Sequence, residues 1–297
     1  MRTWIQAYLN RLEEDRAVSV STRLSYGRDL RDFAEAMERM DVHVPRALLS
    51  SHVQAYLHRL RQEGKSAATI ARRLVSVRAL CRFGVIERIL ERDPTLQLDA
   101  PKPERKAPRT LSAEEVGRLL EAPDEDTVQG LRDRAMLELL YASGMRVSEL
   151  MALDVGHVRP DMGFLHCSGP GSRERIVPIG GAAVRLLKRY LEEGRGRLLR
   201  PDKPTDALFP NHLGTRMTRQ GFWKVIKKYA GTAGIAAELT PHALRQSFAV
   251  HLLGNGADIR AVQEMLGHAS PQTTQRYQTS PKARVKEEYD RAHPRAR

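Results

Sequence analysis

Cysteine and long apolar runs are both nearly missing from this chain of 297 residues. Its two cysteines, Cys81 and Cys167, cannot build a disulfide framework, so we expect a reducing compartment. No run approaches the ~20 apolar residues that a membrane-spanning helix needs. The opening stretch MRTWIQAYLNRLEEDR is interrupted by charges and does not fit a signal peptide. These absences predict a soluble protein of the cytoplasm.

Several common catalytic and cofactor motifs are also absent. The sequence has no GxxxxGKS/T phosphate loop, no HExxH, no paired CxxC and no GxSxG. The turn GPGSRE lacks the third glycine of a dinucleotide-binding fingerprint. His251 falls on the apolar stripe of its segment, which favours a hydrogen-bonded core histidine over a metal ligand. No metal ion, nucleotide or other cofactor is therefore expected.

What the chain does have is an excess of positive charge. Lysine and arginine number 49 against 36 acidic residues, which gives a net charge of +13 and a pI of about 10.1. Such an excess favours a polyanionic partner, although it says nothing about the fold. The length is enough to bury a full core and suits two domains.

Residues 1–99 are expected to form a helical N-terminal domain. Apolar residues recur at helical spacing over residues 21–40, 51–62 and 66–90. Residues 100–110, APKPERKAPRT, contain three prolines and four basic residues without apolar periodicity, which predicts an extended basic linker. A basic linker between two basic domains would let them close around a duplex as a clamp.

Residues 111–297 are expected to form a second domain that is mainly helical with a small β-sheet. The stretch FLHCSGPGSRERIVPIG predicts a β-hairpin, with strands near residues 164–167 and 175–179 around a Gly-Pro-Gly turn. Ser112 and Glu115 form a capping-box signal for a helix after the linker. Further helices are expected at about 131–142, 181–193, 218–230, 241–254 and 258–266.

Four short pieces of the second domain carry residues suited to phosphate chemistry. In YASGMRVSEL, a Ser-Gly break ends one helix and Arg146 opens the next. In TPHALRQSFAVHLL, His242 and Arg245 stand three apart and share a helix face. The stretch LGH supplies His268, and nine residues later comes Tyr277. Taken singly, each has a simpler explanation, such as an ion pair with a nearby carboxylate or a chance HxxR.

In this order the pieces together resemble the tyrosine site-specific recombinases, and within that family the bacterial Xer type. The family carries G-L/M-R-x-S-E-L, then P-H-x-L-R, then L-G-H, and nine residues past that histidine a nucleophilic tyrosine. TRLSYGRDLRDF, KSAATIARRLVSVRAL, MTRQGFW and HPRAR are similar to further family segments. The resemblance implies a two-domain, C-shaped DNA clamp with a core-binding domain (1–99) and a catalytic domain (111–297). The DNA-contacting residues that it implies are Lys65, Arg72, Arg73, Arg219 and Gln220.

The resemblance also gives each residue of the site a role. Tyr277 would attack a DNA phosphodiester and leave a 3′-phosphotyrosine and a free 5′-hydroxyl. The link retains the bond energy, so a second strand can rejoin without ATP or metal. Arg146 and Arg245 would donate to the nonbridging oxygens as negative charge builds up. His242 and His268 would assist proton transfer and bind the phosphate. A free tyrosine has a pKa near ~10, and the surrounding positive charges would favour its phenolate.

One departure from the family pattern affects the expected chemistry. The family places a lysine in the hairpin turn as general acid for the departing 5′-oxygen, whereas Pro170 occupies that place here. Arg173 and Arg175 remain nearby, but a guanidinium gives up its proton too reluctantly to be a good acid. General-acid catalysis is worth ~10²–10⁴-fold, so cleavage should be slowed without being abolished. The candidates to replace the acid are Lys188, Lys203 or a lysine of a neighbouring subunit.

By this resemblance we expect a site-specific DNA recombinase that resolves chromosome dimers at cell division and is associated with the nucleoid. It would act on a double-stranded DNA recombination site, in a tetramer with homologous recombinase subunits, and a DNA translocase at the division septum is a candidate activator. Two alternatives stay open: a catalytically weak DNA-binding subunit that needs an intact partner, and an integrase of a mobile element. The compact length, without an added arm-binding domain, argues against the integrase. Tyr289 is the next candidate nucleophile after Tyr277.

The charge balance generates a prediction about DNA affinity. Lysine and arginine from both domains and the linker would displace counterions from phosphates, so affinity should fall with salt at a log–log slope of roughly −0.9 per phosphate contact. Titrating the purified protein against a duplex at several salt concentrations measures the slope. A nearly flat response would contradict the clamp.

Overall fold

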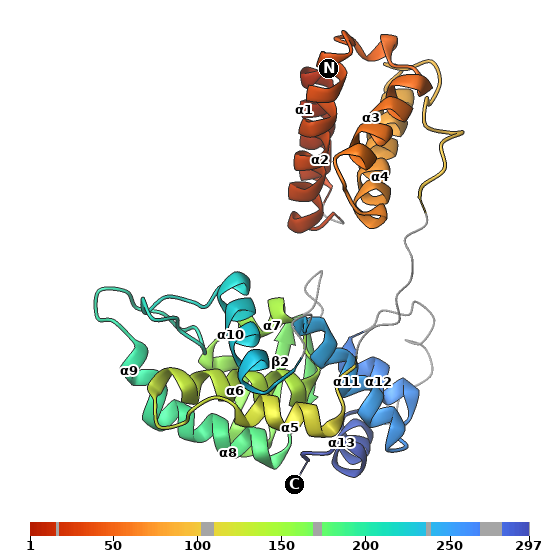
Figure 1. Cartoon of the computed structure of the whole chain (residues 1–297). Coiled ribbons are helices and arrows are strands. Elements are labelled where there is room, and N and C mark those ends of the chain that lie inside the picture. The colour runs from red at the N-terminus through yellow and green to blue at the C-terminus, as the bar shows by residue number, and fades with distance from the viewer. Residues whose placement is uncertain (16–17, 102–109, 169–173, 236–238, 268–280, 297) are drawn as a thin grey trace. The chain divides into compact units, whose positions relative to one another are not determined.

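Two separate hydrophobic cores divide the chain into two units, Met1–Lys106 and Ala107–Arg297. The computed structural model describes all residues except 16–17, 102–109, 169–173, 236–238, 268–280 and 297. Figure 1 shows the first unit in red to orange and the second in yellow to blue. Over the described ranges, no helix combines the length and apolarity needed to cross a membrane.

The described residues of the first unit form a small helical domain. Its helices are α1 (Arg2–Glu14), α2 (Val20–Arg39), α3 (Ser50–Gln62) and α4 (Ala67–Ile86), with a 3₁₀ turn at Pro45–Ala47. The hydroxyls of Ser19 and Ser66 cap α2 and α4 by accepting from the backbone N–H three residues on, at 3.1 and 3.2 Å. With Ser19 as its cap, α2 starts at Val20, slightly before the range 21–40 that the sequence pattern predicts.

The second unit is mainly helical with one small sheet, which confirms the expected fold class. The sheet is antiparallel in the order β1-β2-β3, and Cys167 of β2 lies opposite Arg175 of β3. The pair β2–β3 is the hairpin expected from the sequence, whereas β1 and α13 are additional to the expected elements. The described elements are α5 (Ala113–Glu121), α6 (Val128–Ser143), α7 (Val147–Ala152), η2 (Val155–His157), β1 (Val158–Arg159), η3 (Pro160–Met162), β2 (Phe164–Ser168), β3 (Glu174–Pro178), α8 (Gly181–Arg189), the π-helical turn η4 (Tyr190–Arg195), α9 (Gly196–Leu198), α10 (Arg219–Thr232), α11 (Pro241–Gly254), α12 (Ile259–Leu266) and α13 (Pro281–Ala292).

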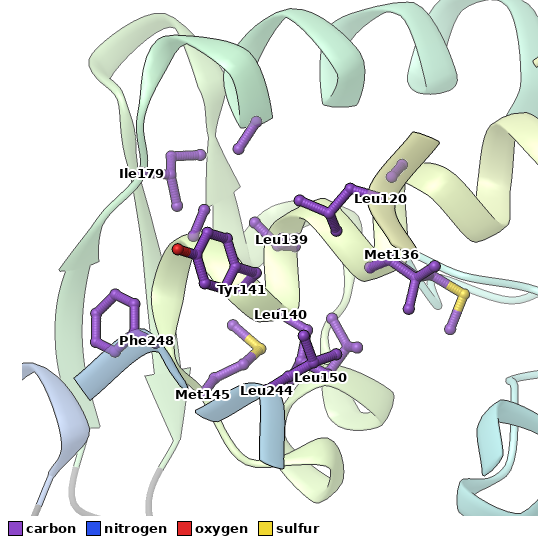
Figure 2. Close-up of a cluster of buried hydrophobic side chains, with 14 of the residues drawn as sticks. Leu120, Met136, Leu139, Leu140, Tyr141, Met145, Leu150, Ile179, Leu244 and Phe248 are labelled. Atoms are coloured by element: carbon purple, nitrogen blue, oxygen red, sulfur yellow. The ribbon is translucent and has the colours of Figure 1, made fainter. Parts of the chain in front are cut away.

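Helix α6 lies at the centre of the second unit. All its residues from Gly130 to Ser143 except Arg134 are buried, and it packs against α8, η4 and α11. Figure 2 shows Tyr141 of α6 in one apolar cluster with Leu244 and Phe248 of α11. This core holds the C-terminal end of α6 against α11. Arg146 follows shortly after α6, and Arg245 lies on α11.

His251 is half-buried and hydrogen-bonded through both ring nitrogens, which agrees with the structural role that its position on the apolar stripe predicts. Its Nε2 lies 2.9 Å from the Leu111 carbonyl and its Nδ1 lies 2.8 Å from the Tyr141 hydroxyl. A carbonyl only accepts, so Nε2 carries the proton and Nδ1 accepts from Tyr141. The Leu111 N–H donates to the hydroxyl of Ser247 at 2.8 Å. Helix α11 therefore anchors Leu111, near the start of the second unit.

Candidate active site

Arg146 stands at the break between α6 and α7. Gly144 ends α6 with φ +57°, and a Cβ there would lie 2.3 Å from the ring of Phe248, so only glycine fits. Arg146 then caps α7: its backbone N–H donates to Oε2 of Glu149 at 2.7 Å. Its guanidinium Nη1 donates to Oε1 of Glu149 at 3.1 Å, and 34% of the side chain stays exposed. Arg146 therefore forms the ion pair with a nearby carboxylate, that of Glu149, and part of its side chain stays accessible to a ligand.

Arg245, on α11, is almost fully buried at 5% exposure. Its Nη1 donates to the Gly144 carbonyl at 2.6 Å, and its Nη2 donates to the Leu266 carbonyl at 2.5 Å. Both carbonyls lie at helix ends, where backbone acceptors lack partners within the helix. Burial, followed by repulsion from Arg146, lowers the pKa of Arg245 to about 10. At neutral pH the guanidinium remains charged, in a place where a further anion would be stabilising.

Arg175 on β3 is the third arginine of this cluster. Its Nη1 and Nη2 donate to the two oxygens of Glu149 at 2.8 and 2.9 Å, and its Nε donates to the Met265 carbonyl at 3.0 Å. Burial alone would raise the pKa of Glu149, but hydrogen bonds from Arg175 and from the Arg146 backbone hold it below its ordinary value. Three guanidinium groups around one carboxylate leave a net positive charge, which suits a phosphate.

The role of Arg175 at the site was not recognised from the sequence, where it was considered only as a poor acid. Strand periodicity contains a signal for it: Arg175 shares a face of β3 with Val177, which is fully buried. A charged residue on the buried face of a strand needs a partner, because an unpaired buried charge is very costly.

His242 lies in the first turn of α11, one turn before Arg245. The hydroxyl of Thr240 caps this helix and Pro241 opens it, both of which favour a helix start at this point. The His242 side chain is exposed. The same helix therefore supplies one buried cation and one accessible imidazole.

Three predicted residues, His268, Tyr277 and Pro170, lie outside the described residues. The described chain leads up to His268, because Gly267 ends α12 with φ +63° directly before it. The carbonyl of Leu266 accepts the hydrogen bond from Arg245. The last described residues before His268 therefore adjoin the arginine cluster.

Two alternatives raised by the sequence are unfavourable. Tyr289, the second candidate nucleophile, is fully buried on α13 and accepts from the Gly180 N–H at 2.9 Å. Burial raises the pKa of its hydroxyl, so it is a poor nucleophile.

Lys188, a candidate acid, pairs with Asp161 at 2.5 Å. Asp161 precedes β2, so this pair lies at the end of the hairpin away from Ser168 and Glu174.

A basic face runs along α10. Arg219 and Gln220, both predicted to contact DNA, are exposed in its first turn. The Nζ of Lys227 lies 5.6 Å from the centroid of the Trp223 ring. The exposed side chains of this face, which recur at helical spacing, are Arg219, Gln220, Trp223, Lys224, Lys227 and Lys228. This combination of cations and an aromatic ring suits a polyanion.

The residues of the first unit that are predicted to contact DNA differ in the exposed fraction of their side chains. On α4, Arg72 pairs with the buried Asp29, and Arg73 pairs with Asp32. Arg73 is only 16% exposed, whereas Arg72 keeps 46% and Lys65 keeps 42% of its side chain exposed. Arg73 is thus used mainly inside the unit, while Lys65 and Arg72 retain surface for a phosphate.

Comparisons with known proteins agree over the whole chain. Residues 109–284 match the phage integrase family, and residues 5–88 match the family described as phage integrase, N-terminal SAM-like domain. Tyrosine recombinase XerD of Oceanobacillus iheyensis is 46% identical over 293 residues, which cover 98% of both chains. Tyrosine recombinase XerD of Staphylococcus aureus is 43% identical over 296 residues, which cover 100% of both chains.

Solved structures share the fold. A lambda integrase dimer bound to a COC′ core site has a TM-score of 0.72 at 17% identity, and the match covers 91% of this chain and 95% of that one. The XerH site-specific recombinase bound to difH substrate, in a pre-cleavage complex, has a TM-score of 0.68 at 25% identity, with 94% and 82% coverage.

The ion pairs of Arg73 generate a stability prediction. Arg73→Met removes one of the groups that donate to Asp32 and should lower the free energy of unfolding of the first unit by about 1–3 kcal/mol. Asp32 would keep its hydrogen bonds from Tyr56 and Arg59. Arg219→Met, at an exposed position on α10, is the matched control and should change stability by less than about 0.5 kcal/mol. Thermal unfolding of the full chain measures both. Equally small effects would contradict the structural role of Arg73.

Proposed function

The chain belongs to the phage integrase family, and on that premise we propose that it is a site-specific recombinase which cuts and rejoins DNA through a 3′-phosphotyrosine at Tyr277. The observation that carries this proposal is the arginine cluster. Arg146 and Arg245 come from distant parts of the sequence and lie around one carboxylate, beside the end of α12 that precedes His268. The relatives named tyrosine recombinase XerD, which match over the whole length of this chain, support the same activity.

The two arginines bind the scissile phosphate and stabilise the transition state. Attack on the phosphodiester produces a pentavalent phosphorane that carries more negative charge than the substrate. Arg245 is held rigidly by two backbone carbonyls, and Arg146 uses only Nη1 of its guanidinium in its described contact with Glu149. Positioned donors of this kind each contribute about 2.7–4 kcal/mol of transition-state stabilisation. Their charge also favours the phenolate of Tyr277.

His242 and His268 complete the phosphate pocket. In this proposal, one assists the proton transfer from Tyr277 and the other donates a hydrogen bond to the phosphate. The exposed position of His242 one turn before Arg245 supports such a contact. The phosphotyrosine link retains the energy of the broken bond, so the free 5′-hydroxyl of a second strand can attack it and rejoin the DNA.

DNA binding involves both parts of the chain. We assign residues 1–99 to a core-binding domain, 100–110 to a basic linker and 111–297 to the catalytic domain. The exposed charges of Lys65 and Arg72 and the α10 face with Arg219 and Gln220 support contacts to the duplex; Arg73 would contribute less. The chain would act in a tetramer with homologous subunits and resolve chromosome dimers in the nucleoid of the cytoplasm, with a DNA translocase as activator.

A second candidate function is a weakly cleaving subunit that relies on an intact partner. Pro170 favours it, because the sequence has no lysine between Lys106 and Lys188 to serve as general acid in the hairpin turn. Lys188, one candidate replacement, is engaged in an exposed ion pair with Asp161. Lys203 is exposed in the segment between α9 and α10 and remains a candidate.

The first prediction of this proposal concerns the nucleophile. Tyr277→Phe removes only the attacking oxygen, so this variant should bind DNA as the unmodified protein does but form no covalent complex. A suicide substrate, whose cleaved strand cannot be rejoined, traps the adduct for denaturing gel electrophoresis. Tyr289→Phe is the matched control and should still form the adduct. An adduct that persists in Tyr277→Phe would place the nucleophile elsewhere.

The second prediction concerns Pro170. Without a general acid, the 5′-oxygen must leave largely unprotonated, and this step should limit the rate. A substrate with sulfur at the bridging 5′ position has a leaving group of much lower pKa, so it should be cleaved faster by something like the ~10²–10⁴ general-acid factor.

Pro170→Lys tests the same step from the protein side. It should speed cleavage of the oxygen substrate and shrink the difference between the two substrates, provided that the turn tolerates the loss of the fixed φ of proline. Equal rates on both substrates in the unmodified protein would show that another acid acts or that chemistry is not limiting.

A further inference from the structure

Arg175 is the most completely engaged of the three clustered arginines. Its side chain is 12% exposed, and all three of its nitrogens donate: Nη1 and Nη2 to Glu149, and Nε to the Met265 carbonyl. Glu149 in turn accepts from Nη1 and from the backbone N–H of Arg146. The carboxylate therefore accepts four hydrogen bonds, which is about its full acceptor capacity.

Arg175 also fixes the end of α12. The carbonyls of Met265 and Leu266 are consecutive, and Arg175 and Arg245 each take one of them. A Cβ on Gly267 would lie 3.2 Å from Cδ, Nε and Nη1 of Arg175, so the backbone before His268 packs directly on this guanidinium. One side chain thus contacts the carboxylate of α7 and the helix end that precedes His268.

We propose that Arg175 is a positioning residue for strand cleavage: it neutralises Glu149 so that Arg146 remains free to bind the scissile phosphate. This inference rests on the proposed function. Glu149 and the phosphate are both anions that suit a guanidinium fork, so they compete for Arg146. The bidentate pair with Arg175 supplies the charge that Glu149 needs, and Arg146 is left with a single side-chain bond to it.

A direct role of Arg175 at the phosphate is unfavourable. Both arms of its fork already bind Glu149, and little of the side chain is accessible. It is also a poor replacement for the missing general acid. Burial alone would lower the pKa of Arg175, but its hydrogen bonds to Glu149 outweigh burial and raise it.

Among the described residues, the partner that Glu149 would keep without Arg175 is Arg146. In Arg175→Gln we expect the Arg146 fork to close on Glu149, so that the phosphate loses its donor. The cleavage rate should fall about 10- to 100-fold, the rate equivalent of one charge-assisted hydrogen bond. DNA affinity should change by less than about threefold, because the many other phosphate contacts persist.

The decisive variant is the double substitution Glu149→Gln with Arg175→Gln. Glutamine at position 149 can still accept the Arg146 N–H and cap α7, but it carries no charge to hold the arginine. If Arg175 acts by neutralising Glu149, the double variant should cleave faster than Arg175→Gln alone. A merely structural role of Arg175 would make the two losses add.

The experiment measures the rate of covalent adduct formation on a suicide substrate at saturating protein, with DNA affinity and thermal unfolding measured in parallel on the full chain. Arg175→Lys should cleave faster than Arg175→Gln but slower than the unmodified protein, because lysine restores the charge without the fork. If Arg175→Gln does not fold, Arg175→Lys with and without Glu149→Gln makes the same comparison.

Two results would overturn the inference. One is an Arg175→Gln variant that cleaves as fast as the unmodified protein. The other is a double variant that is as slow as the product of the two single effects. An unmodified protein that forms no Tyr277-dependent adduct would instead refute the proposed function, so the two failures are distinguishable.

Discussion

The carboxylate of Glu149 is the interaction on which the geometry of the site depends. It is 6% exposed, and a buried carboxylate is stable only when it is paired. Arg146 reaches it from the start of α7 and Arg175 reaches it from β3. Glu149 therefore links the start of α7 to the hairpin through its hydrogen bonds with Arg146 and Arg175. Arg175 extends this network to the end of α12, because its Nε donates to the Met265 carbonyl.

The cost of this arrangement falls on Arg245. It is buried beside another arginine, and burial together with that repulsion lowers its pKa to about 10. The protein offsets part of this cost with the carbonyls of Gly144 and Leu266. A bound phosphate would offset more, because its negative charge would lie beside the guanidinium groups of Arg146 and Arg245. The site is thus electrostatically incomplete by itself and suited to an anion, as expected where perturbed pKa values cluster.

Local sequence patterns predicted much of the fold. The Ser112–Glu115 capping box is present with both of its hydrogen bonds, at 2.9 and 3.1 Å, because a cap depends only on residues three apart. The hairpin β2–β3 follows from a turn between two strand-forming runs. The partners of Arg72 and Arg73 could not be predicted, because helical spacing says which face a residue occupies but not which side chains the neighbouring helix presents. The carboxylates of Asp29 and Asp32 were therefore missed.

The sequence by itself determined the residue types of the site, the family to which the chain belongs and the backbone break that requires Gly144. These depend on motifs and on conformations within a few residues. The tertiary structure alone decided which partners the arginines take: Arg73 binds carboxylates of the first unit and Arg175 binds Glu149. Arg245 binds the carbonyls of Gly144 and Leu266, and Arg146 stays partly exposed. The reason is the short reach of a hydrogen bond, about 3 Å, because such contacts between segments far apart in the sequence exist only once the elements of each unit have packed together, as α6 and α11 do in Figure 2.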